Sequence, residues 1–216
     1  MRAFLKFGAF AVTTALLGAV LVACSPMSTM ALGSTGSSVA SGMSCFLTNA
    51  NPSKSADFGG LSLAGCPVPT RIVKSWRAYL SSPGAGSAIH ARDRIGRGPW
   101  QNAKGVKVAS SVEDLHSANN QLSKVNSLTE KGEVIAGRGD AVNMHDILSG
   151  STADGRLDTS AADTTCGGWS KSGEGSAIVG HHERSGLNEL APAKSWNASH
   201  GTRGCSMDAL KATGGG

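Results

Sequence analysis

The features that best indicate the fold lie in the segment Thr165–Ser206, TCGGWSKSGEGSAIVGHHERSGLNELAPAKSWNASHGTRGCS. Cys166 and Cys205 bracket it, and it contains two of the four tryptophans and three of the six histidines. A polar, glycine-rich segment buries too little apolar surface to hold one conformation, so a covalent clamp at its base is a natural remedy. Clamped loops on a rigid base are also common positions for binding residues.

The first 23 residues have the features of an export signal. A short basic region precedes an apolar run from Ala9 to Val22, which is too short for a comfortable membrane span. The residues Leu21-Val22-Ala23-Cys24 resemble a bacterial lipobox, in which Cys24 becomes the lipid-carrying first residue of the mature protein. Ser25 in the next position points to the outer membrane. An ordinary cleaved signal and an uncleaved anchor are the alternatives.

Charge and cysteine content narrow the class of protein. Removal of the signal takes away Arg2 and Lys6 and leaves 18 basic against 15 acidic residues. Without a run of basic residues, and with few aromatic ones, the chain is not expected to bind nucleic acid. Export permits disulfides, and lipid would occupy Cys24. The other four cysteines, Cys45, Cys66, Cys166 and Cys205, allow three pairings, among which the sequence does not choose.

The mature chain divides into a tether and one domain. Residues 24–43 are rich in Ser and Gly and predict a flexible tether, whereas residues 44–216 have the length of a single domain. Alternating apolar residues predict a strand over Ser75–Ser81, with Trp76 near its centre. Shorter strands are expected at Ser44–Thr48 and Gly105–Ala109. Ser111, with Asp114 three residues later, predicts the start of a helical turn.

Several short motifs, taken in order, resemble the bacterial exported lectin-like proteins of the C-type-lectin-like superfamily, whose fold is shared by endostatin. The resemblance covers residues from Cys45 to the C-terminus and rests on motifs that are individually weak. They are Trp76–Leu80, Arg92–Gly96, Gly98–Trp100, Asn143–Gly150, Thr165–Trp169, Val179–His182, Ser195–His200 and Gly204–Ser206.

The resemblance implies an α+β fold: a C-type-lectin-like domain with small antiparallel sheets, one or two short helices and a long irregular loop region. It implies a disulfide between Cys166 and Cys205 across the loop. It would pair an earlier cysteine, Cys66, with one in a final strand. The chain stops at Gly216, where that strand is expected, so residues 44–216 are expected to be a C-terminally truncated domain. Cys66 is then unpaired or bonded to Cys45.

Neither the usual calcium site of C-type lectins nor a zinc site is expected in the domain. Sugar-binding C-type lectins hold Ca²⁺ with a Glu-Pro-Asn or Gln-Pro-Asp triplet and a Trp-Asn-Asp motif. Here only Trp196-Asn197 is present, so the usual calcium site is not expected. His181, His182 and His200 suggest zinc, but neighbours on a strand point to opposite faces, and a further ligand such as His145 or Asp146 would have to come from a distance. We therefore predict no metal and no other cofactor.

No nucleophile–base motif of a hydrolase is present, which predicts a protein that is not an enzyme. The expected function is a surface lipoprotein whose loop region 137–204 binds carbohydrate or another extracellular or envelope macromolecule. An adhesin or structural envelope protein is the alternative, and a metal-dependent hydrolase the less favoured one. The expected ligand-binding residues are Trp169, Trp196, Asn197, His200, His182, Asn143, Asp146 and Asn188.

Overall fold

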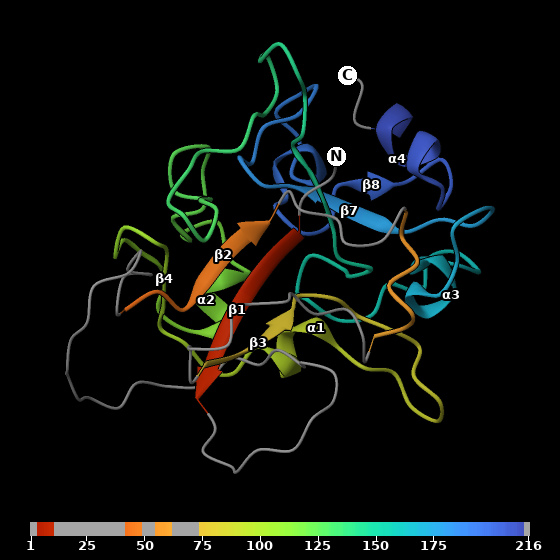
Figure 1. The fold of residues 1–216 in the computed structure, drawn as a ribbon, viewed down its shortest axis with the longest axis horizontal. Coiled ribbons are helices and arrows are strands. Elements are labelled where there is room, and N and C mark those ends of the chain that lie inside the picture. The colour runs from red at the N-terminus through yellow and green to blue at the C-terminus, as the bar shows by residue number, and fades with distance from the viewer. Residues whose placement is uncertain (1–3, 11–41, 49–54, 62–73, 214–216) are drawn as a thin grey trace.

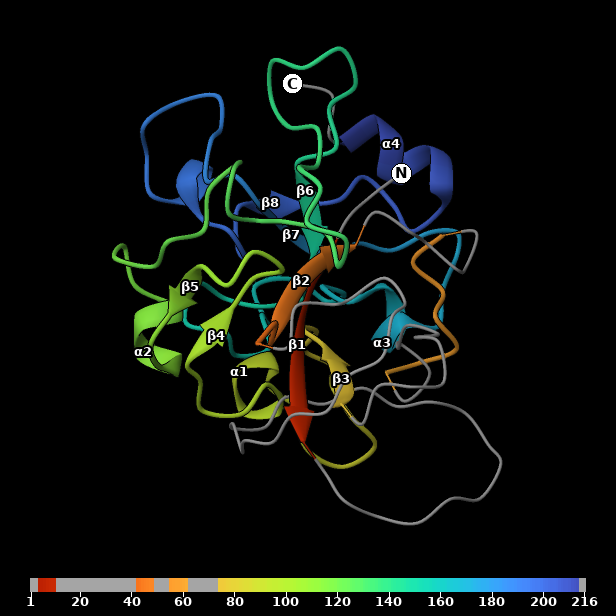
Figure 2. The ribbon, with the colours of Figure 1, turned by 60° about the vertical axis from the view of Figure 1, so that its left-hand side comes forward.

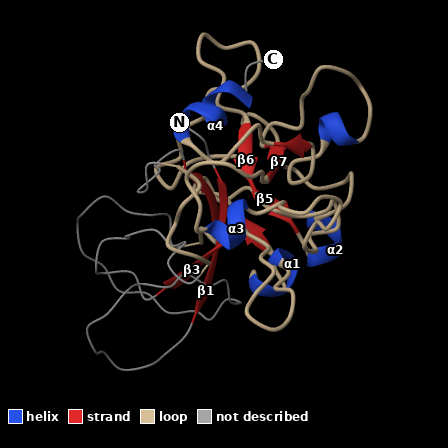
Figure 3. Ribbon diagram, turned by 90° about the vertical axis from the view of Figure 1, so that its right-hand side faces the viewer, coloured by secondary structure: helices blue, strands red, loops and turns tan. Residues whose placement is uncertain are grey.

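The computed structural model describes residues 4–10, 42–48, 55–61 and 74–213. Its helices are short and its strands form small antiparallel sheets, so the expected α+β class is confirmed. Loops connect these elements over most of the described chain (Figure 3). In chain order the elements are β1 (Phe4–Phe10), β2 (Cys45–Thr48), β3 (Lys74–Ala78), α1 (Ala91–Arg94), β4 (Trp100–Gln101), β5 (Lys107–Ala109), α2 (Val112–Leu115), β6 (Asp146–Leu148), α3 (Cys166–Trp169), β7 (Ile178–His181), η1 (Pro192–Lys194), β8 (His200–Gly201) and α4 (Met207–Thr213).

Three sheets organise the described chain. The first has the order β2-β1-β3, the second pairs β4 with β5, and the third has the order β6-β7-β8. The third sheet lies beyond one end of the first sheet (Figures 1 and 2). The α4 helix lies near the third sheet at the same end of the molecule (Figure 1).

The segments expected to be ordered early in the chain are ordered. β2 and β5 fall within the predicted strands, and α2 begins where Ser111 predicted a helical turn. β3 overlaps the strand predicted over Ser75–Ser81 but begins at Lys74 and ends at Ala78. Ser111 Oγ accepts a hydrogen bond from the Asp114 amide at 3.2 Å, which satisfies an amide at the start of the helix. Trp76 is buried and packs edge-on against Phe46 with ring centroids 4.7 Å apart. Apolar alternation was therefore sufficient to locate this part of the core.

The predicted clamp between Cys166 and Cys205 is present as a disulfide with Cα atoms 5.7 Å apart. The segment it encloses is less irregular than expected, because β7 and β8 belong to the third sheet. Cys45 is a buried free thiol, and burial raises its pKa. The alternative bond between Cys45 and Cys66 is therefore not formed. Cys66 itself lies outside the described residues, so its own state stays a prediction.

Asp163 supports the first turn of the clamped segment. Its Oδ1 accepts hydrogen bonds from the amides of Thr165 at 3.1 Å and Gly167 at 3.0 Å. Lys171 Nζ lies 3.6 Å from its Oδ2. Between these contacts the chain turns through Cys166–Trp169, where all four residues have positive φ. Cys166 and Trp169 carry side chains in a backbone region that costs energy for residues other than glycine, so the turn needs such support.

β1 is the middle strand of the first sheet, although it belongs to the predicted leader. Its pairing runs from Phe4 opposite Thr48 to Phe7 opposite Cys45 on one side. On the other side it runs from Lys6 opposite Ala78 to Phe10 opposite Lys74. The structure is that of the uncleaved chain, and cleavage before Cys24 would remove this strand. Cys24 and the tether as far as residue 41 lie outside the described residues, so lipidation stays a prediction.

We expect the substitution Asp163→Asn to lower the free energy of unfolding by about 1 kcal/mol at neutral pH. Partial burial opposes ionisation, but hydrogen bonds from Gly167 and Thr165 lower the pKa of Asp163. Stabilisation by a carboxylate of depressed pKa is present above its unfolded-state pKa and is lost as the pH falls through its folded-state pKa. In urea unfolding, the difference from wild type should therefore shrink below about pH 4. A loss of stability in Asp163→Asn that is the same at neutral pH and below about pH 4 would contradict this role. So would an equal loss in the exposed control Asp93→Asn.

A chain that begins at Cys24 should unfold at a lower urea concentration than the full chain. Its free energy of unfolding should fall by at least about 3 kcal/mol, because β2 and β3 lose the hydrogen-bonded ladders that each shares with β1. The two exposed edges should also promote association between chains. Circular dichroism in urea and light scattering measure these effects. Equal unfolding midpoints for the two chains would show that β1 contributes nothing to the sheet.

Candidate metal centre

The third sheet places three polar side chains on one of its faces. β6 pairs with β7 so that Asp146 lies opposite His181. β7 pairs with β8 so that Val179 lies opposite His200. Directly opposed residues share a face of a sheet, and so do residues two apart on one strand. The register therefore directs Asp146, His181 and His200 to the same face.

Gly180 permits the close approach of the segment that leads into β8. A Cβ atom at this position would lie 2.1 Å from the carbonyl carbon of Trp196 and 2.2 Å from the nitrogen of Asn197. Only glycine avoids this clash with the backbone. The amide of His181 also donates a hydrogen bond to the carbonyl of Ser195 at 2.9 Å. The chain thus runs alongside β7 and brings His200 to the site.

Asp146 Oδ1 lies among three imidazole nitrogens. The Nε2 atoms of His145, His181 and His200 lie 3.3, 3.5 and 3.6 Å from it. The ring of His145 stacks on that of His181, with centroids 4.1 Å apart and planes inclined by 9°. The Nε2 atoms of His181 and His200 are 3.1 Å apart. We call His145, Asp146, His181 and His200 the His–Asp cluster.

Hydrogen bonds to the other ring nitrogens define the protonation of two of these histidines. His181 Nδ1 lies 2.7 Å from the carbonyl oxygen of Ala193, and His145 Nδ1 lies 3.0 Å from Glu183 Oε1. A carbonyl and a carboxylate only accept, so each Nδ1 carries the proton. A neutral imidazole with its proton on Nδ1 has a lone pair on Nε2, and the Nε2 atoms of both rings lie next to the Asp146 carboxylate. Such imidazole nitrogens are common metal ligands.

The surroundings favour the neutral form of His181 and the ionised form of Glu183. His145, Asp146 and His181 are each less than 5% exposed. Burial, with a contribution from neighbouring His145, lowers the pKa of His181. Burial opposes the ionisation of Glu183, yet hydrogen bonds from His145 and the Arg138 amide lower its pKa. A neutral imidazole and an ionised carboxylate are the forms in which these groups bind metals.

The cluster has the composition of a site for a divalent transition metal. Donor atoms of His145, Asp146 and His181 all lie within 4.8 Å of one another. Zinc is commonly bound in proteins by imidazole nitrogen and carboxylate oxygen, with about four ligands. A hard cation such as Ca²⁺ would require six to eight oxygens, which this mainly nitrogen set does not supply. Ligating histidines also usually donate their second N–H to a carboxylate or a backbone carbonyl, as His145 and His181 do.

Two of the expected binding residues belong to the cluster, Asp146 and His200. His145 and His181 were expected only as possible metal ligands, and the sequence predicted no metal. That expectation rested on the distance between these residues along the chain, and the fold removes the distance. Adjacent His181 and His182 do point apart, as predicted. His182 is buried, with Nε2 3.4 Å from the Ala136 carbonyl and 3.3 Å from Glu183 Oε2.

Trp169 and Trp196, which were expected to bind the ligand, are buried in the described fold. Trp169 is fully buried and Trp196 is 3% exposed. Trp169 Nε1 donates to the Ser81 carbonyl at 2.7 Å, and Trp196 Nε1 donates to the Leu115 carbonyl at 2.9 Å. Both rings are core anchors, because a buried indole needs an acceptor for its N–H.

The remaining expected residues do not converge on one site. Asn197 is buried and donates to the Tyr79 hydroxyl at 2.9 Å, which makes it part of the core. Asn143 accepts a hydrogen bond from the His145 amide at 3.2 Å, so it helps to shape the loop before β6. Asn188 is exposed and accepts a hydrogen bond from the Leu190 amide at 3.0 Å.

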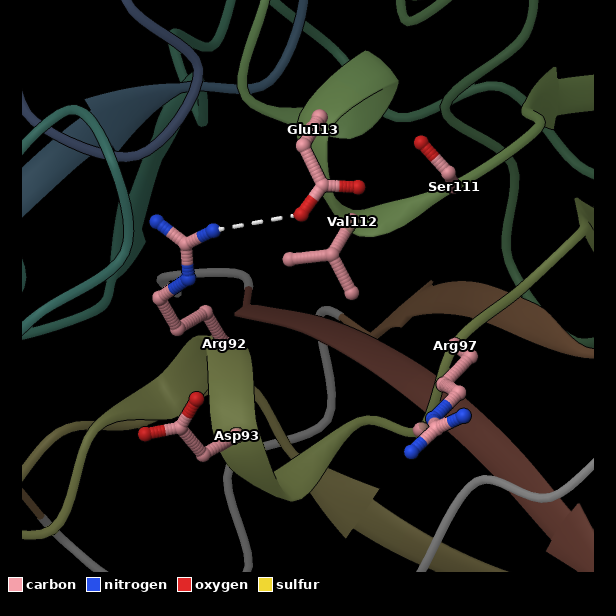
Figure 4. Close-up of a pocket in the computed structure, with 7 residues that line it drawn as sticks. Arg92, Asp93, Arg97, Ser111, Val112 and Glu113 are labelled. Carbon is pink, nitrogen blue, oxygen red and sulfur yellow. Dashed lines mark ion pairs between the residues drawn. The ribbon is translucent and has the colours of Figure 1, made fainter.

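A separate hollow of about 580 Å³ lies between α1 and α2, outside the region 137–204 (Figure 4). Arg92 faces Glu113 across it, with Nη2 and Oε1 3.5 Å apart. Arg92 also donates to the Asp154 carbonyl at 2.8 Å, so its charge is already engaged. The described residues that line the hollow are mainly charged or small, and none of them is aromatic. These residues are Arg92, Asp93, Gly96, Arg97, Ser111, Val112 and Glu113.

Within the described ranges, none of the helices is both long and apolar enough to cross a membrane. Comparison with family models, with curated proteins and with solved structures found no match to this chain. The proposed function therefore rests on the geometry of the site.

Proposed function

We propose that this protein is a metal-binding domain that holds one divalent transition-metal ion, Zn²⁺ in the first instance, in the His–Asp cluster. The observation that carries the proposal is the convergence of three buried donor groups. The Nε2 atoms of His145 and His181 face the buried carboxylate of Asp146, and an acceptor at Nδ1 orients each ring. Donor atoms of these three residues all lie within 4.8 Å of one another, and imidazole nitrogen and carboxylate oxygen are common zinc ligands.

The proposed setting is the one that the sequence predicts. The domain would have a C-type-lectin-like fold and would be carried on the outer membrane by a lipid at Cys24. Its role would be binding rather than catalysis, with a glycan or an envelope macromolecule as the partner. The small antiparallel sheets, the short helices and the Cys166–Cys205 disulfide are compatible with this proposal. The buried tryptophans give the carbohydrate part no support.

Removal of a buried ligand should abolish tight zinc binding. We expect His181→Ala and His145→Ala each to weaken zinc binding by roughly 100-fold or more, since loss of even an outer hydrogen-bonding partner costs 10- to 100-fold. Competition with a chromophoric chelator measures the dissociation constant. At a free zinc concentration 100 times that constant, the wild-type protein should gain about 2.7 kcal/mol of stability. The matched control is His90→Gln, because His90 accepts a hydrogen bond from the Leu157 amide away from the cluster.

Wild-type protein that binds no zinc with a micromolar or lower dissociation constant would overturn the proposal. So would an affinity that His181→Ala and His90→Gln reduce equally, because the ion would then lie elsewhere.

Glu183 should strengthen zinc binding without touching the ion. Its Oε1 orients the His145 ring and keeps the proton on Nδ1. We expect Glu183→Gln, which retains an acceptor but loses the charge, to weaken zinc binding about 10-fold. The same chelator competition measures the change, with exposed Glu174→Gln as the control. Unchanged affinity in Glu183→Gln would show that this carboxylate does not act on the cluster.

A further inference from the structure

Hydrogen bonds from separate segments orient two histidines of the His–Asp cluster. Behind His145 stands the carboxylate of Glu183, and behind His181 stands the carbonyl of Ala193. Outer hydrogen bonds of this kind fix the direction of a ligating ring. The Nδ1 atom of His200 lies 3.2 Å from the carbonyl of its own neighbour, Gly201.

His200 also differs in position and exposure. It belongs to β8, a strand of two residues at the edge of the third sheet. Its side chain is 38% exposed, whereas those of His145 and Asp146 are 5% and 2% exposed. The three buried donors lie within 4.8 Å of one another in a group that does not include His200. Solvent therefore reaches the cluster from the side on which His200 lies.

The charge of the cluster decides which outside ligand it favours. A divalent ion with the carboxylate of Asp146 and neutral imidazoles leaves one net positive charge. The carboxylate of Glu183 contacts the far nitrogen of His145, so a whole ring separates it from the ion position. An anionic oxygen donor is favoured over a neutral one at such a centre.

We infer that His145, Asp146 and His181 are the resident ligands of the ion, and that His200 is an exchangeable fourth ligand which gives way to a carboxylate from solution or from a bound macromolecule. This inference rests on the proposed function. Metal sites with three protein ligands and one exchangeable position accept outside ligands, whereas sites with four fixed ligands are closed. The contrast between a well-oriented buried set and one exposed histidine on an edge strand is that of the open type.

Cobalt(II) provides the test, because its visible absorption reports the ligands of the ion. The full chain is titrated with Co²⁺ as wild type, His200→Ala and His145→Ala, and each complex is then titrated with acetate and with neutral acetamide. We expect His200→Ala to weaken Co²⁺ binding only about tenfold, against roughly 100-fold or more for His145→Ala. Acetate should change the spectrum of the His200→Ala complex saturably, and that of the wild type at higher concentration. Acetamide should change neither.

Three results would contradict the inference about His200 or the proposed metal binding, and the measurements distinguish which of the two fails. Loss of Co²⁺ binding in His200→Ala as large as in His145→Ala would make His200 a resident ligand and overturn the inference alone. Failure of acetate to change the His200→Ala spectrum, or an equal effect of acetamide, would also overturn it and leave metal binding intact. Absence of Co²⁺ binding to the wild type would instead overturn the proposed function.

Discussion

In the His–Asp cluster the Nε2 atoms of two imidazoles, those of His145 and His181, lie next to one buried carboxylate, and the proposed metal site depends on this arrangement. Elsewhere in a protein interior, a carboxylate beside a histidine accepts its N–H and the pair is satisfied. Here the N–H groups of His145 and His181 are turned away, toward Glu183 and the Ala193 carbonyl. The Nε2 atoms and the Asp146 carboxylate then form a set of donors that a divalent cation would bind favourably.

The scaffold around the cluster serves to place short strands in register. β6 and β7 pair over three residues and β7 and β8 over two, which is too little to hold position by themselves. The connection between β7 and β8 is fixed instead by buried anchors. Trp196 packs against Tyr79 with ring centroids 4.6 Å apart, and the Cys166–Cys205 disulfide closes the segment. Gly180 then lets the backbone of residues 196 and 197 lie directly against β7.

The exposed and the buried parts of the clamped segment have different roles. Its tryptophans and Asn197 stabilise the core, which is why they are hidden from any partner. In the proposed metal site its exposed member is His200 at the sheet edge, next to the buried side chains of His181, His145 and Asp146. A ligand that reached the ion would approach along this edge. Binding would thus depend on the metal rather than on aromatic stacking.

Much of the fold was predictable from local sequence. Apolar alternation around Trp76 located β3, and Ser111 with Asp114 located α2, because strand alternation and helix capping depend on residues close in the chain. The resemblance to lectin-like proteins supplied the Cys166–Cys205 pairing, which composition alone left open. The role of β1 was missed, since an apolar run near the start reads as an export signal whether or not it also pairs in a sheet.

The sequence by itself located the strand around Trp76 and the helical turn after Ser111, and its resemblance to lectin-like proteins supplied the α+β class and the Cys166–Cys205 disulfide. Only the tertiary structure decided that His145, Asp146, His181 and His200 meet. Their spacing in the chain follows no metal-binding motif, because the ligands come from three strands whose register is set by long-range pairing and by the close approach at Gly180. Sheet register and backbone packing of this kind depend on contacts between distant residues, and no local pattern records them.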